Sequence, residues 1–534
     1  MKIRVYRFRL RGPRLIVLRW LDDLLNSRIL AYKRLIPPKA GFFLIIILAI
    51  AFMIPARIID PMPVQADAGI MRWDVINTPG FFVDRFDILS PSDIIHMAAG
   101  KNGRVVAIAR VPEPASPNLS QNLIYHSNNN GASWINTAFN NLSTFWADNE
   151  MYHVAIAPDN PDVWAVTYGI AAEGYAPRHV IYTDNAGVNW VDCGITLTNA
   201  AESIRGIDIS VPYKDNIRDL GVVTVTGTGN GSFYISSSRA WEQWRNQCLA
   251  PSVAPVTPGT VDYFSIKFSP SYPSDFSIAL IYANATTSYF NVGFRDTATN
   301  TTGNYAFTSP GVEVKNSSSA ANASPGMLQL INSDLELPDD FLGQSATLRR
   351  VYVSLDADGS KSPTCQDGIF RIDDTHVYML MDTTRTLDKS IYSIAYYGTY
   401  ASGKLLAGEH HGFPCSATVP TWFTDSPTVC PIPCWYPALK PATGAAAQGT
   451  CTTAKDGMGS ARVAWNDDGS LAFAGTGSLP EQTGAAWFNN LLLFPIWNDE
   501  SAFSISRTNG ETWNQTGLID TTIDWLNDVA PSID

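Results

Sequence analysis

The chain has few charged residues, and basic ones are scarce through most of it. Charged residues make up 16% of the 534 positions, with 37 Lys and Arg against 49 Asp and Glu. Residues 1–68 hold twelve of the basic and four of the acidic residues, which leaves 25 and 45 for the rest, a net charge of about −20. Because such a surface repels phosphate backbones, we expect no nucleic-acid partner.

Several common catalytic patterns are also missing. The sequence contains no Ser-His-Asp arrangement, no phosphate-binding glycine loop and no cofactor fingerprint, so we expect no cofactor. Gly (38) and Pro (34) are abundant, as are Asn, Ser and Thr, and this composition favours short strands joined by turns. With 45% hydrophobic residues, the chain is predicted to be globular and all-β.

The amino-terminal region differs from the rest. Residues 1–40 carry eleven Lys and Arg against two Asp, and the uncharged run "GFFLIIILAIAFMI" follows at 41–54. A basic flank before an apolar run sends the following chain across a membrane, so an extracytoplasmic location is predicted. The run is shorter than the roughly 20 residues of a spanning helix. It suits a signal peptide cleaved at "ADA" (66–68), with an uncleaved membrane anchor as the alternative.

These features predict four regions. Residues 1–40 form a cytoplasmic or signal n-region, 41–56 a hydrophobic signal or anchor helix, 57–70 a linker and 71–534 the folded domain. Segment 71–80 resembles the outer strand of a repeat unit, and segment 523–534 resembles an opening strand. The domain is therefore expected either to close with a reduced unit or to belong to a longer product.

All seven cysteines follow residue 68. In an oxidising compartment disulfides are the default expectation. Two bridges are expected within the long loop that holds the last four, and a bridge between Cys193 and Cys248 would join adjacent units. Cys365 is then left over, and a metal site made by the last four is a weaker alternative. The disulfide candidates are Cys193, Cys248, Cys415, Cys430, Cys434 and Cys451.

Similar segments recur along the domain. Each has an alternating apolar stretch, a Pro/Asn/Asp/Gly turn and a second strand, and the copies start near residues 94, 151, 204, 263, 349, 391 and 460. Most of the spacings are roughly 45 to 70 residues, which fits units of four short strands. A lone sheet of this size cannot bury both faces, whereas radial stacking covers them. The sequence therefore predicts a β-propeller of about seven four-stranded blades, with eight as the alternative.

A short turn also repeats, as "SNNNGASWI" (127–135), "TDNAGVNWV" (183–191) and "SRTNGETWN" (506–514). We expect each turn to join the third and fourth strands of a blade, with Gly allowing positive φ and Trp packing between blades. The turns resemble the Asp-box, or BNR, repeat S-x-D-x-G-x-T-W of sialidases, sortilin-type receptors, photosystem II assembly factors and glycan-degrading propellers. A degenerate fourth copy is "SSSRAWEQW" (236–244). The positions concerned are Ser127, Asn129, Gly131, Trp134, Thr183, Asn185, Gly187, Trp190, Ser506, Thr508, Gly510, Thr512 and Trp513.

The resemblance implies a fold more than an activity, because in that family the box lies away from the ligand face. A sialidase would carry an "FRIP" strand and three arginines for a carboxylate. The nearest string here is "FRID" (370–373), and arginines are sparse. A glycosidase would need paired carboxylates, for which the candidates are Asp356, Asp373, Asp374, Asp467 and Asp468. All five fall in predicted turns, where Asp is common, so no catalytic residue is assigned.

Metal-binding patterns are weak. "SLDADGS" (354–360) places Asp356 and Asp358 as candidate calcium ligands, but the closing Glu of a calcium loop is missing. In "GEHHG", His410 and His411 would point to opposite faces of a strand, so joint ligation of a metal would need a loop.

Three functional hypotheses follow. The first is an exported, non-catalytic scaffold that binds a protein or glycan through the loops on one face and reaches the membrane through residues 41–56 if these are uncleaved. The second is a glycoside hydrolase, which requires a convergent acid pair at the central channel. The third is an assembly factor for a membrane complex, which would favour the uncleaved anchor.

Overall fold

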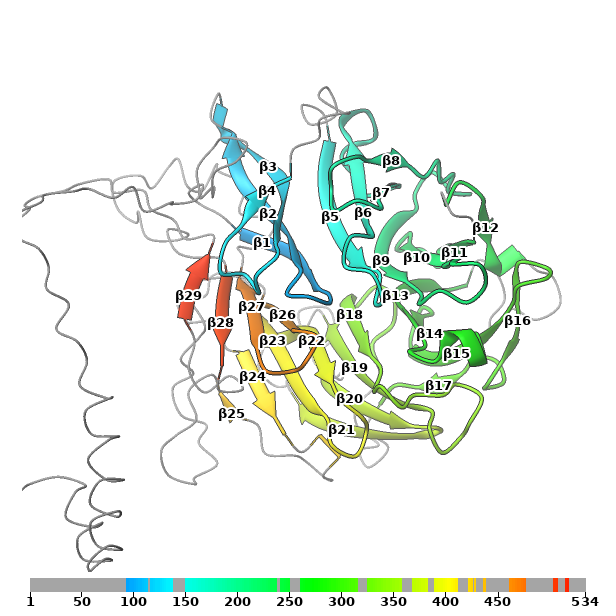
Figure 1. Cartoon of the computed structure of the whole chain (residues 1–534). Coiled ribbons are helices and arrows are strands. Elements are labelled where there is room, and N and C mark those ends of the chain that lie inside the picture. The colour runs from blue at the N-terminus through cyan, green and yellow to red at the C-terminus, as the bar shows by residue number, and fades with distance from the viewer. Residues whose placement is uncertain are drawn as a thin grey trace, which may run out of the picture. The chain divides into compact units, whose positions relative to one another are not determined.

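The protein is described by a computed structural model, and its described part is almost entirely β-strand (Figure 1). All described residues belong to one compact unit, Val75–Asn527. The predicted basic segment 1–40, helix 41–56 and linker 57–70 lie outside the described residues, and so do the two terminal segments expected to resemble strands. No helix within the described part is long and apolar enough to span a membrane. The structure describes residues 93–113, 116–137, 149–237, 241–249, 260–315, 324–357, 367–382, 389–411, 421–425, 427–428, 436–437, 461–476, 503–507 and 514–517.

Within these residues the strands form seven antiparallel sheets, here called blades 1 to 7, each built from strands that follow one another in the chain. Blade 1 comprises β1 (Asp93–Ala99), β2 (Val105–Glu113), β3 (Ser116–Ser127) and β4 (Ile135–Asn136). Blade 2 comprises β5 (Asn149–Ile156), β6 (Trp164–Ile170), β7 (His179–Thr183) and β8 (Val191–Asp192), with the short helix η3 (Ala171–Glu173). Blade 3 comprises β9 (Ser203–Ile209), β10 (Leu220–Val225), β11 (Phe233–Ser236) and β12 (Trp244–Asn246), followed by η4 (Gln247–Leu249).

The other four blades repeat this order. Blade 4 comprises β13 (Asp262–Phe268), β14 (Ser277–Ala283), β15 (Ser288–Asp296) and β16 (Thr301–Tyr305), with helix α3 (Tyr272–Asp275) and an added strand, β17 (Val312–Glu313), that pairs with β15. Blade 5 comprises β18 (Leu330–Glu336), β19 (Arg350–Ala357), β20 (Gly368–Asp373) and β21 (His376–Asp382). Blade 6 comprises β22 (Lys389–Tyr397), β23 (Lys404–His411), β24 (Thr421–Thr424) and β25 (Tyr436–Pro437). Blade 7 comprises β26 (Ala461–Trp465), β27 (Ala472–Thr476), β28 (Phe503–Ser506) and β29 (Asn514–Gly517).

The blades are buried on both faces because they stack on one another. Every residue of β14 is buried, and so is every residue of β10, which removes the in-out alternation expected of a sheet with one wet face. Seven apolar clusters cover the seven junctions between neighbouring blades, including the junction of blade 7 with blade 1. The ring is therefore closed, and the prediction of an all-β propeller with seven blades is confirmed.

Blades 7 and 1 meet through side chains from both. The ring of Trp134 packs edge-on against Phe503 with centroids 4.6 Å apart. The backbone N–H of Asn102 donates to the Oδ2 of Asp467 at 3.1 Å. Within the described residues no sheet combines strands from the two ends of the chain, so this junction depends on packing.

Candidate functional site: the central channel

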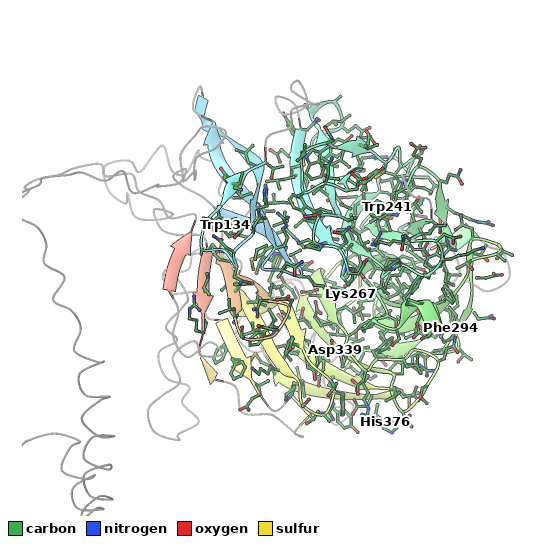
Figure 2. The ribbon with its side chains drawn as sticks, in the orientation of Figure 1. Trp134, Trp241, Lys267, Phe294, Asp339 and His376 are labelled. Carbon is green, nitrogen blue, oxygen red and sulfur yellow. The ribbon has the colours of Figure 1, made fainter. Side chains whose placement is uncertain are left out.

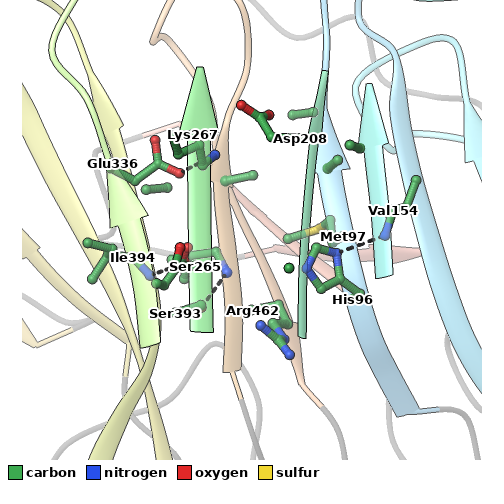
Figure 3. A pocket seen from close by; sticks show the side chains of 18 of the residues that line it. His96, Met97, Val154, Asp208, Ser265, Lys267, Glu336, Ser393, Ile394 and Arg462 are labelled. Carbon is green, nitrogen blue, oxygen red and sulfur yellow. Dashed lines mark hydrogen bonds and ion pairs between the residues drawn. The ribbon is translucent and has the colours of Figure 1, made fainter. Parts of the chain in front are cut away.

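The first strand of every blade faces a central cavity of about 470 Å³ (Figure 3). These strands are β1, β5, β9, β13, β18, β22 and β26, and they lie innermost in the ring (Figure 1). Figure 2 shows Lys267 and Asp339 near the axis, whereas Trp134, Trp241 and His376 lie in the outer parts of the blades. Each blade thus contributes its own side chains to one shared cavity.

A β-bulge aims the side chains of the first strands into this cavity. Six of these strands show a register shift at the same place, immediately before the residue that we call the bulge position. A bulge bends a strand and redirects its side chains. Arg462 of β26 lies at the same level, because its Nε donates to the carbonyl of Ile95 in β1 at 3.0 Å. The bulge positions are His96, His153, Gly206, Ser265, Asn332 and Ser393.

Channel side chains also tie neighbouring first strands together. The backbone N–H of Phe268 donates to Asp208 Oδ2 at 2.7 Å, and that of Ile394 donates to Asp334 Oδ2 at 3.0 Å. The Oγ of Ser393 accepts from the N–H of Val463 at 3.2 Å. These bonds satisfy backbone amides that have no partner within their own blade's ladder.

One end of the channel is acidic. Lys267 Nζ lies 2.9 Å from Glu336 Oε1, with Asp208 and Asp334 nearby. Burial raises the pKa of Glu336 to about 7 despite the attraction of Lys267, and burial also raises the pKa of Asp208. Burial alone would lower the pKa of Lys267, but the three carboxylates raise it. One lysine therefore serves three carboxylates, and this end keeps an excess of negative charge.

The other end is basic. Arg462 lies over the ring of Tyr392, 4.0 Å from its centroid, and the exposed Arg205 has no hydrogen bond or ion pair with any described residue. Burial, with Arg462 and Arg205 adding to it, lowers the pKa of His153 to about 3. Burial and Arg462 also lower the pKa of His96. The two imidazoles, 5.4 Å apart, are therefore neutral at pH 7.

The first repeated turn lies between β3 and β4. The Ser127 Oγ accepts the N–H of Gly131 at 2.8 Å and that of Asn129 at 3.2 Å. The Asn129 Oδ1 accepts the N–H of Ser133 at 2.8 Å. Gly131 has φ +79°, and a Cβ there would lie 2.2 Å from the Phe503 ring, so only glycine fits. Trp134 is buried in the cluster between blades 1 and 7.

The second repeated turn, between β7 and β8, has the same hydrogen bonds. Thr183 Oγ1 accepts the N–H of Gly187 at 2.9 Å, and Asn185 Oδ1 accepts that of Asn189 at 2.9 Å. Trp190 is buried between blades 1 and 2, and its Nε1 donates to the Gly187 carbonyl at 3.1 Å.

The third copy begins at Ser506, the last residue of β28, and β29 begins at Asn514. The copy is thus placed between the third and fourth strands of blade 7, although Thr508, Gly510, Thr512 and Trp513 lie outside the described residues. The degenerate fourth copy lies between β11 and β12, where Trp241 packs edge-on against Tyr182. The Asp-box assignment itself stays a prediction.

The carboxylates predicted as glycosidase candidates do not converge. Asp356 is buried within β19, Asp373 pairs with Arg371 at 3.1 Å, and Asp374 pairs with Arg349. Asp467 and Asp468 lie in the exposed turn after β26, and of the five only Asp467 lines the channel. The "FRID" string is part of β20, the third strand of its blade, and does not line the channel.

The predicted bridge between Cys193 and Cys248 is wrong, because both thiols are free. Cys193 lies in the cluster between blades 2 and 3, and Cys248 in the cluster between blades 3 and 4. Equivalent positions of successive blades are separated by the packing distance between two sheets, about 10 Å. That distance is greater than the Cα separation of about 7 Å that a disulfide spans. The remaining candidates, Cys415, Cys430, Cys434 and Cys451, lie outside the described residues, as does Cys365.

The described residues hold no group of His, Cys, Asp and Glu that could bind a metal ion. Of the two candidate calcium ligands, Asp356 is in a strand and not in the predicted turn, and Asp358 lies outside the described residues. His410 and His411 are neighbours in β23 and pair with Ser390 and Lys389 of β22.

Sequence reasoning missed the channel residues. Alignment of the recurring segments on their opening strands would have placed His96, His153, Ser265, Ser393 and Arg462 in one column. A polar residue recurring in an otherwise apolar strand was the available signal. The acidic end had a signal of the same kind, because Asp208, Lys267 and Asp334 each come two residues after their bulge positions, and only Glu336 stands in another column.

No protein family matches this sequence, and no curated protein matches it. Among solved structures, the chain is similar to YCF48 bound to a D1 peptide, at 10% identity and TM-score 0.40, over 73% of this chain and 93% of that one. It is also similar to the Hadza microbial sialidase Hz136, at 9% identity and a TM-score of 0.37, over 73% of this chain and 64% of that one. A PL25 ulvan lyase is similar at 9% identity and a TM-score of 0.41, over 82% of this chain and 98% of that one. Similarity at this level says nothing about ligand or chemistry, and the propeller assignment rests on the sheets and their packing.

Proposed function

We propose that the protein is an exported, non-catalytic propeller that binds a protein or glycan ligand at its central channel and the adjoining loop face. The observation that supports this is the engagement of the three deep carboxylates. Asp208 and Asp334 accept backbone N–H groups of the next blade, and Glu336 pairs with Lys267. Carboxylates that hold blades together are poorly placed to transfer protons to a substrate.

Export is part of the proposal and rests on the sequence. The basic residues 1–40 and the apolar run that follows are typical of a segment that directs the rest of the chain out of the cytoplasm. Sequencing the amino terminus of the mature protein distinguishes cleavage near residue 68 from retention of the anchor. Retention would favour a membrane-bound scaffold or assembly factor over a secreted binder.

A glycan-cleaving enzyme is the second candidate, and one observation favours it. The pKa of Glu336, raised to about 7 by burial, suits a general acid at neutral pH. The pairing of this carboxylate with Lys267 at 2.9 Å argues against that role.

The test compares binding with turnover. The wild type, Glu336→Gln and the control Glu313→Gln, which alters an acid on β17 remote from the channel, are screened against polysaccharides and extracted proteins. We expect the wild type and the control to retain ligand, and none of the three proteins to release new reducing ends or unsaturated products. Product release by the wild type and the control, lost in Glu336→Gln, would overturn the proposal in favour of the enzyme.

A further inference from the structure

The two ends of the channel carry opposite charge at a defined separation. Arg205 is the bulged residue of β9, and Arg462 bonds to the carbonyl at the equivalent level of β1. Arg462 is 9% exposed, and its Nη nitrogens donate to no described residue although its side chain faces the channel (Figure 3). The imidazoles of His96 and His153 beside it are neutral, so among the described residues that line this end none balances the two guanidinium charges.

The acidic groups lie further along the first strands of their blades, β9 and β18. Asp208 and Asp334 come two residues after their bulge positions, and Glu336 comes four residues after Asn332. At about 3.3 Å per residue, they lie about 7 to 13 Å from the arginine level. Figure 3 shows Arg462 and His96 towards one end of the channel and Glu336 and Asp208 towards the other.

We propose that the channel binds a free peptide of about three residues, with its terminal carboxylate at Arg205 and Arg462 and its terminal ammonium among Asp208, Asp334 and Glu336. This inference rests on the proposed binding function and names the ligand class of the same site.

The chemistry of each end fits one end of such a ligand. A guanidinium binds a carboxylate through two parallel hydrogen bonds. The two positive charges of Arg205 and Arg462 exceed the one negative charge of the carboxylate. An extended tripeptide spans about 10 Å, which matches the separation of the two levels. The cavity of about 470 Å³ has room for it, and the neutral imidazoles can exchange hydrogen bonds with its amides. A sugar acid, with one charged group, would use only the basic end.

The experiment measures binding of trialanine, N-acetyl-trialanine and trialanine amide to the full chain by titration calorimetry. We expect the two blocked peptides to bind at least tenfold more weakly than the free one, because each loses one charged contact. Arg205→Gln should bind trialanine about tenfold more weakly than the wild type does, while its affinity for trialanine amide should be unchanged. The affinity of Arg205→Lys for trialanine should lie between those of the wild type and Arg205→Gln. The control Arg245→Gln alters an exposed arginine of the outer strand β12 and should behave as the wild type.

Three results would overturn the inference. The first is equal affinity for the free and blocked peptides, and the second is equal affinity for glucuronate and trialanine. The third is no binding of trialanine at about ten times its expected dissociation constant, which is about 1 mM. Thermal unfolding of each variant checks that it is folded. If trialanine fails while a glycan or protein is still retained, only this inference falls. If the channel cleaves any ligand, the proposed function falls with it.

Discussion

The repeated turns between the third and fourth strands, here called the rim, belong to the same unit as the first strands at the channel. The turns of blades 1 and 2 keep their residue types, whereas the channel positions change from blade to blade. At the rim, Ser127 and Thr183 accept the same two amides in blades 1 and 2, and a glycine with positive φ follows each. At the channel, the bulge position changes from His96 to Gly206 to Asn332 around the ring. Blades 1 and 2 keep the same turn with the same hydrogen bonds. The channel, in contrast, is shared, and each blade can supply a different group.

This contrast separates residues that build the ring from residues that make a site. A rim residue such as Trp190 is buried and repeated in kind, so its loss should be measured as lost stability. A channel residue such as Arg205 is exposed and occurs once, so its loss should be measured as lost binding.

The largest expected effect is at the rim. Trp190→Ala should lower the free energy of unfolding by about 3–5 kcal/mol, because it empties a buried site between blades 1 and 2. Urea unfolding followed by fluorescence or circular dichroism measures it. Val191→Ala, at a neighbouring residue that is 41% exposed, is the control and should change little. Equal stability of the two variants would contradict the inter-blade role of the tryptophan.

The hydroxyl that opens the turn should matter less. Ser127→Ala should cost about 1–2 kcal/mol of unfolding free energy, because it leaves the buried amide of Gly131 without its acceptor. Ser127→Thr should keep wild-type stability, since Thr183 performs the same bonding in blade 2. If the threonine variant were as unstable as the alanine variant, the two turns would not be equivalent.

A channel histidine should change the pH dependence of stability. The pKa of His153 is lowered to about 3 in the folded state by burial, while the unfolded chain keeps about 6.5. Between these values the unfolded state holds more protons, so stability is complete above pH 6.5 and falls as the pH drops. At pH 5, His153→Gln should take up about one proton fewer on unfolding than the wild type. An unchanged slope of unfolding free energy against pH would count against a neutral imidazole.

The smallest effect on stability belongs to the residue with the largest proposed effect on binding. Arg205→Gln should unfold within about 0.5 kcal/mol of the wild type, because the side chain is exposed and has no partner among the described residues. Urea midpoints of the two proteins test this. A loss comparable to that of Ser127→Ala would mean that Arg205 supports the ring and would erase the distinction between rim and channel.

Much of the fold could be predicted because its causes are local. Alternating apolar residues, turn-forming Asn and Gly and the spacing of Trp134 and Trp190 each act within one unit, and four-stranded units without cores of their own must stack. The cysteine pairing failed for a related reason. Cys193 and Cys248 looked adjacent as equivalent points of neighbouring units, but a whole packed sheet lies between them.

The sequence by itself determined the blade, its turns and the number of blades, because these depend on patterns within a few tens of residues. Only the tertiary structure decided the channel. Arg462 bonds to Ile95 across more than 360 residues of chain, and Lys267 meets Glu336 from another blade. Such neighbours exist only once the ring has closed, because closure turns the first strands of all blades towards one axis.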